Sequence, residues 1–182
     1  VYFCLQYRPS GGREATSFVG RKLMQWPPLV GGTATCVPAP EVKEELIALT
    51  EQFFSAVGFI GLCSMEFKRD RRDGRFYMVE PTVGRTDYQE EIATLNGVNI
   101  PFAAWRGEMG LPPPPNRQTR PSGWRDPFGE ANSRAAAPSD AREFAMPMHN
   151  AYWSPTDPFP FFAVHGQRIR NRLSRLLRGN HE

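Results

Sequence analysis

The sequence lacks any apolar run long enough to cross a membrane, since a spanning helix needs about 18 to 20 consecutive apolar residues. Its net charge of +3 is small, so composition gives no case for nucleic-acid binding. Paired cysteines are also missing, because Cys4, Cys36 and Cys63 stand singly in strand-like segments. This spacing predicts buried free thiols in the reducing cytoplasm rather than a disulfide framework or a zinc site.

The 182 residues, 40% of them hydrophobic, are enough for one globular domain with a buried core. Short apolar runs between proline and glycine clusters predict strands, and apolar residues at helical spacing predict helices. We expect strands over 1–7, 15–26, 33–37, 61–68 and 75–80 and helices over 40–57, 87–95 and 101–109. Residues 1–110 therefore indicate an α+β domain. Because the chain begins inside an expected strand at Val1, we also expect a further N-terminal part of the protein.

The second half of the chain has weaker patterns. Residues 111–160 are dominated by proline, glycine, serine and arginine, which predicts an extended wrap over the surface or a partly disordered linker. The aromatic residues of this stretch favour the wrap, namely Trp124, Phe128, Phe144, Tyr152 and Trp153. Residues 161–182 predict a basic amphipathic helix. We interpret it as docked on the domain with a solvated basic face, with an anionic membrane or partner as the alternative.

Glu66 and Glu80 are the most informative pair of residues. Residues 61–68 and 75–80 are predicted to form a hairpin whose turn is centred near Arg72 and Asp73. In that register the two glutamates are cross-strand neighbours, with Cβ atoms roughly 5 Å apart. Like charges at that distance repel. Either a metal ion neutralises them, or one carboxylate keeps its proton, or the register differs.

Three basic residues are candidates for contact with a phosphate or a substrate carboxylate. Lys68 is predicted on the same strand face as Glu66, where it could reach a phosphate or form a salt bridge with a glutamate. Arg21 and Lys22 lie on an earlier strand and could bind an anion or be solvated. The sequence leaves both alternatives open for each residue.

The run from Gly61 to Gly97 resembles the C-terminal half of an ATP-grasp domain, closest to the carboxylate–amine ligase branch. The resemblance is carried by a glutamate on each hairpin strand, by Arg85 after the second strand, and by the helix that ends Leu95-Asn96-Gly97-Val98-Asn99-Ile100-Pro101. Residues 20–28 look like the strand and turn that lead into this half. The likeness covers roughly residues 1–110. It implies an antiparallel sheet packed with helices, followed here by an irregular Pro/Arg-rich extension and a C-terminal helix.

The resemblance implies that Glu66 and Glu80 hold Mg (or Mn), which bridges the phosphates of ATP, and that Arg85 steadies an acyl phosphate. Two positions depart from the family pattern. Thr82 stands where an asparagine usually completes the metal shell, although a threonine hydroxyl can also coordinate magnesium. Arg85 falls one place later than the usual arginine, a shift that Gly84 could absorb. Arg21, Lys22 and Lys68 are the candidate nucleotide contacts.

The family therefore implies an ATP-dependent ligase that joins a small-molecule carboxylate to an amine. No phosphate loop is recognisable in the sequence, because Gly11-Gly12 is a hairpin turn without a following helix. We therefore expect the segment by itself to be inactive and to depend on the missing N-terminal part. Two alternatives are a non-catalytic remnant that acts as an interaction module, and a polyanion or membrane-surface binder whose hairpin carboxylates pair with Arg69, Arg71 or Arg72.

Overall fold

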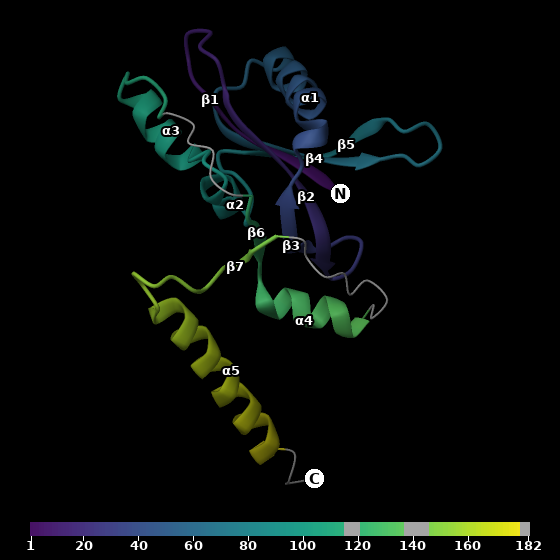
Figure 1. The fold of residues 1–182 in the computed structure, drawn as a ribbon, viewed down its shortest axis with the longest axis vertical. Coiled ribbons are helices and arrows are strands. Elements are labelled where there is room, and N and C mark those ends of the chain that lie inside the picture. The colour runs from purple at the N-terminus through teal and green to yellow at the C-terminus, as the bar shows by residue number, and fades with distance from the viewer. Residues whose placement is uncertain (115–120, 137–145, 179–182) are drawn as a thin grey trace.

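The computed structural model describes residues 1–114, 121–136 and 146–178, which form one sheet with helices on both faces (Figure 1). The strands lie in the order β5-β4-β1-β2-β3-β6-β7. Their bounds are β1 Tyr2–Arg8, β2 Thr16–Trp26, β3 Gly32–Pro38, β4 Gly61–Arg69, β5 Phe76–Val83, β6 Gly123–Arg125 and β7 Met148–Asn150. Neighbouring strands are antiparallel except β6 and β7, which pair in parallel. The predicted α+β class is confirmed.

The helices have clear start signals in the sequence. Their bounds are α1 Lys43–Ala56, α2 Glu91–Leu95, α3 Ile100–Glu108, α4 Pro127–Ala136 and α5 Phe159–Arg178, and a short 3-10 helix at Pro40–Val42 leads into α1. The Asn99 side chain caps α3 by accepting a hydrogen bond from the Phe102 amide at 2.9 Å. The helix predicted over 87–95 is shorter in the structure, because the residues before Glu91 form hydrogen-bonded turns.

Alternation along the strands divides the core into two clusters, one on each face of the sheet. On one face, here called the α3 face, Phe3 packs with residues of α2 and α3 such as Ile92 and Ile100. On the opposite α1 face, Cys4 and Met65 pack with Phe54 of α1. This alternation assigns each strand residue to one face, and only side chains on the same face can come together at a site.

Residues 111–160 contain more regular structure than the predicted wrap. β6 pairs with β3, β7 pairs with β6, and α4 packs against β2 and β3, so this stretch extends the sheet. Trp124 is only 2% exposed, and its indole nitrogen donates a hydrogen bond to Glu91 at 3.0 Å. The strands escaped prediction because three residues each are too few to show alternation. Phe144, which was expected to support the wrap, lies outside the described residues.

The C-terminal helix expected at 161–182 begins slightly earlier, as α5, and projects away from the sheet (Figure 1). Helices that could cross a bilayer are absent from the described part of the chain.

Replacing Trp124 tests whether β6 is integral to the fold. Trp124→Ala leaves a large cavity and removes the hydrogen bond to Glu91, so we expect the free energy of unfolding to fall by about 3 to 5 kcal/mol. Trp105→Ala is the matched control, because that side chain is 54% exposed, and it should cost less than about 1.5 kcal/mol. Urea unfolding followed by circular dichroism measures both. Equal losses would mean that β6 does not contribute to the cooperative core.

The buried cysteines predict a fall in stability at alkaline pH. Burial raises the pKa of Cys4 and of Cys63 to about 12. Between about pH 9 and 12 the unfolded chain loses thiol protons that the folded chain keeps, so stability falls as pH rises, by up to about 1.4 kcal/mol per pH unit for each thiol. Urea midpoints at pH 8 to 10 should fall less steeply in a Cys4→Ala/Cys63→Ala variant. Equal slopes would contradict this origin.

Candidate functional site

The two glutamates predicted to face each other do so. Glu66 on β4 and Glu80 on β5 are cross-strand partners, which confirms the predicted pairing. A β-bulge is needed for this pairing. Near the turn Arg69 pairs with Phe76, and continuing that register would place Val79 opposite Glu66. The irregularity between Glu66 and Phe67 shifts β5 by one residue and brings Glu80 into place instead.

The cation beside this pair belongs to the chain itself. The Nζ atom of Lys22 on β2 donates a hydrogen bond to Oε1 of Glu66 and forms an ion pair with it. The Lys22 and Glu66 side chains are 5% and 19% exposed, so both charges are largely removed from water. The sequence left three explanations for the opposed carboxylates, namely a metal ion, a protonated carboxylate or a different register. The structure adds a fourth, a lysine that neutralises Glu66. Glu80 remains exposed to solvent.

Lys22 reaches Glu66 across β1, which lies between their strands. Phe3 on β1 is the partner of Glu66 on one side and of Gly20 on the other. A Cβ atom at Gly20 would lie 2.3 Å from Cζ of the Phe3 ring, so the ring occupies the space that a side chain would need. Because Gly20 lacks a side chain, the buried ring and the charged pair fit on the same α3 face.

Further polar groups continue along the same face. Ser64 on β4 is the cross-strand partner of Thr82, two residues from the glutamates on each strand. The Ser64 hydroxyl donates a hydrogen bond to Oδ1 of Asp87 at 2.7 Å, and Gln89 Nε2 donates to Oδ2 at 3.2 Å. Asp87 was missed by the sequence analysis, because it lies beyond the hairpin and only the fold returns it to β4.

The other predicted site residues are more scattered. Arg21 is paired with Tyr2 and therefore lies on the α1 face, opposite to Lys22. Lys68 is on the same face as Glu66 but is exposed, opposite Tyr77. Arg85 is exposed beyond the end of β5, and its Nη1 donates a hydrogen bond to the Thr86 carbonyl at 3.2 Å. The structure thus gathers Lys22, the two glutamates and Thr82, and leaves Arg21 apart.

The hairpin arginines have partners within the turn. Arg72 forms an ion pair with Asp70 at 2.5 Å, which lowers the pKa of the Asp70 carboxyl. Arg69 donates from Nε to the Gly74 carbonyl at 2.9 Å. These contacts stabilise the turn, and Lys22, rather than Arg69 or Arg72, is the residue bound to Glu66.

The donor atoms at the hairpin fit a hydrated magnesium ion. Within the described residues, clusters of three or more His, Cys, Asp or Glu side chains suited to a metal are absent. Two carboxylates and the Thr82 hydroxyl are nevertheless hard oxygen donors on one face. Magnesium is usually held by one or two carboxylates and completes its shell with water and substrate phosphates. Glu80, exposed to solvent, could accept such an ion without displacing Lys22 from Oε1 of Glu66.

Removal of Lys22 tests the charge balance of the site. Lys22→Met leaves Glu66 largely buried beside Glu80 without its cation, and we expect a loss of about 2 to 4 kcal/mol in unfolding free energy. Glu66→Gln in the same background should cost less than it does in the parent chain, because the two side chains are coupled. Lys43→Met, at an exposed lysine of α1, is the control and should change stability by less than about 0.5 kcal/mol. Urea unfolding measures the cycle, and strictly additive losses would argue against coupling.

Comparison with known proteins gives structural likeness only. No protein-family model and no curated protein matches the chain. Among solved structures, an ADP complex of PurK, N5-carboxyaminoimidazole ribonucleotide synthetase, aligns over 66% of this chain with a TM-score of 0.53 and 16% identity. Two structures of pyruvate carboxylase from Rhizobium etli align over 60% of the chain with TM-scores of 0.50 and 17% identity, one of them a T882A variant with the allosteric activator acetyl coenzyme A.

The chain spans only part of each of these proteins, namely 32% of PurK and 10% and 11% of the two pyruvate carboxylases. Both are ATP-grasp enzymes. The chain has the fold of an ATP-grasp subdomain, as its sequence predicts.

Proposed function

We propose that the chain is part of an ATP-dependent carboxylate–amine ligase that acts through an acyl phosphate. The observation that carries the proposal is the arrangement of Lys22, Glu66 and Glu80 on one face of an ATP-grasp sheet. Opposed carboxylates beside a lysine are costly for folding and useful for holding a metal–phosphate complex. The ADP in the PurK structure supports an adenine nucleotide as the ligand.

Each residue has a role in this proposal. Glu66, Glu80 and Thr82 would hold Mg (or Mn), which, when bound, neutralises phosphate charge and orients the terminal phosphate. The Lys22 ammonium limits repulsion between the carboxylates and offers its remaining protons to a phosphate oxygen. Lys68, exposed on the same face, is a second phosphate contact. Arg21 lies on the opposite face and is left out of this site.

The proposed reaction has two steps. An oxygen of the substrate carboxylate attacks the terminal phosphorus of ATP, ADP leaves, and an acyl phosphate forms. The amine then attacks the acyl carbon, inorganic phosphate leaves, and the nitrogen loses a proton to give an amide. Arg85 would stabilise the acyl phosphate, since its guanidinium is exposed at the end of β5 and can approach from the strand terminus. Such transfers depend mainly on positioning and charge neutralisation.

One observation favours a second candidate, a non-catalytic remnant that serves as an interaction module. Lys22 already supplies a positive charge to Glu66, and Thr82 stands where the family carries an asparagine. In a domain that had lost its metal, the Lys22 ammonium would still neutralise Glu66 and keep the hairpin folded. The two candidates differ in one property, since only the ligase requires a divalent cation at the hairpin.

Calorimetric titration of magnesium and ATP into the chain tests the proposal. Any binding heat that the chain gives should disappear in Glu66→Gln and in Glu80→Gln, because each removes a charged ligand from a site that has few. Glu44→Gln is the matched control, since this exposed carboxylate lies on α1 at the other face and should leave the heat unchanged. Binding that persists in both hairpin variants would place the metal elsewhere and refute the assignment.

The Thr82→Asn variant separates the ligase from the remnant. A working metal site should bind magnesium and ATP at least as well with asparagine, whose carbonyl is an oxygen ligand of suitable reach. If neither the parent chain nor Thr82→Asn gives binding heat, the same titration on a protein that includes the expected N-terminal part distinguishes the two candidates. Absence of binding heat from that protein would favour the remnant.

A further inference from the structure

The C-terminal helix α5 is attached to the domain by one side of its first turns. The ring centroid of His165 lies 5.1 Å from that of Phe128 on α4, and Phe161 packs edge-on against Trp153 at 5.4 Å. One turn later Cζ of Arg168 lies over the ring of Phe128 at 3.8 Å from its centroid. Residues 161, 165 and 168 follow helical spacing, so one stripe of α5 faces the domain.

A second stripe of α5 is apolar and exposed. Phe162 and Ile169 are 63% and 62% exposed, although large apolar residues are normally buried. In the sequence the same stripe continues at positions 173, 176 and 177, all of them leucine. At 100° per residue these positions fall within an arc of roughly 100°, the width of a stripe that faces an apolar surface. The domain does not bury the described part of this stripe.

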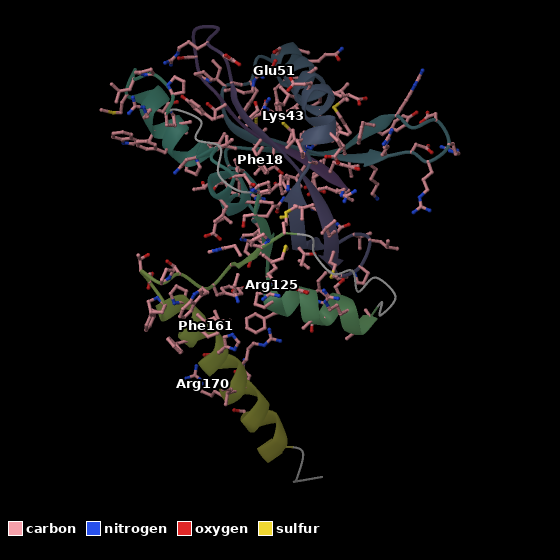
Figure 2. All side chains as sticks on the ribbon, in the orientation of Figure 1. Phe18, Lys43, Glu51, Arg125, Phe161 and Arg170 are labelled. Carbon is pink, nitrogen blue, oxygen red and sulfur yellow. The ribbon has the colours of Figure 1, made fainter. Side chains whose placement is uncertain are left out.

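The rest of α5 is strongly basic. Residues 159–178 include Arg168, Arg170, Arg172, Arg175 and Arg178 and no aspartate or glutamate. At helical spacing, positions 170 and 172 fall on the two edges of the apolar arc. Figure 2 shows Arg170 on the part of α5 that extends beyond the domain, and this side chain is exposed. An apolar arc bordered by arginines is the pattern of a helix that lies at a lipid surface.

We propose that α5 binds the surface of an anionic lipid bilayer, lying in its plane with the exposed Phe162 and Ile169 turned toward the acyl chains. The arginines would contact lipid headgroups. The proposal goes beyond the ligase activity and does not depend on it.

Two other occupants fit the helix less well. A second copy of α5 would bring its own arginines against these, with no acidic residue in the helix to offset them. The stripe also covers little more than two heptads, fewer than a stable coiled coil requires. A nucleic acid would satisfy the arginines but leave Phe162 and Ile169 exposed to water. Of these three occupants, only a lipid surface complements both the charge and the apolar arc.

Flotation of the full chain with lipid vesicles tests the proposal. The probes are vesicles of phosphatidylcholine alone and of phosphatidylcholine with about one quarter phosphatidylglycerol. We expect binding to the anionic vesicles only, weakened at least about tenfold between 50 and 500 mM salt as the charges are screened. Equal binding to both compositions, or no binding to either, would overturn the proposal.

Two variants and a matched control locate the contact. Arg170→Glu/Arg172→Glu and, separately, Ile169→Ser/Leu173→Ser should each reduce vesicle binding at least about tenfold. Arg71→Glu/Arg75→Glu makes the same charge change at the exposed turn of the β4–β5 hairpin and should lower it much less. Circular dichroism and thermal unfolding must show that each variant stays folded, which is expected because Arg170 and Ile169 are exposed.

The two alternative occupants give different outcomes. Concentration-dependent dimerisation without lipid, abolished by Ile169→Ser/Leu173→Ser, would identify a second copy as the partner and overturn the lipid proposal. Binding to an oligonucleotide or heparin that exceeds vesicle binding and ignores the serine variant would identify a polyanion instead. Loss of vesicle binding in both α5 variants with retention in the hairpin control supports the lipid surface. None of these results depends on ligase activity, so this proposal and the proposed function can fail separately.

Discussion

The ion pair between Lys22 and Glu66 is the interaction on which the candidate site depends. It joins β2 to β4 across β1, and it lies where a third strand, β5, brings a further carboxylate. A largely buried glutamate opposite another glutamate would destabilise the hairpin unless a cation neutralised it. Lys22 provides that cation from within the sheet, and this permits both carboxylates to be present in the folded chain before any ligand arrives.

The pair also needs two local departures from regular structure. The bulge at Val79 puts Glu80 rather than its neighbour opposite Glu66. Gly20 leaves room for the buried Phe3 ring on the face that carries Lys22 and Glu66. A regular hairpin would turn Glu80 to the other face, because a shift of one residue reverses every side chain. Charge, bulge and glycine therefore act together, and the proposed metal site is a consequence of sheet geometry as much as of residue type.

The sequence predicted contacts that are close along the chain and missed those that the fold creates. The Glu66 and Glu80 pairing followed from turn chemistry over a few residues, although the bulge that makes it possible left no sequence signal. Lys22 was one candidate among three, because nothing local connects residue 22 with residue 66. Asp87 and Trp124 became visible only when the topology returned their segments to the sheet. The three-residue strands β6 and β7 carry too little pattern for alternation to show.

Sheet topology also bears on whether a ligase site and a lipid-binding helix can coexist. β5 and β7 are the two edges of the seven-stranded sheet of the described residues, and α5 follows β7. With strands about 4.8 Å apart, six spacings separate those edges by roughly 29 Å. That distance exceeds three Debye lengths at physiological salt, about 8 Å each, so a charge beyond the β7 edge would be screened from Glu80 on β5. A bilayer held at the β7 edge would likewise leave the carboxylates open to nucleotide. The two surfaces are therefore compatible in one chain.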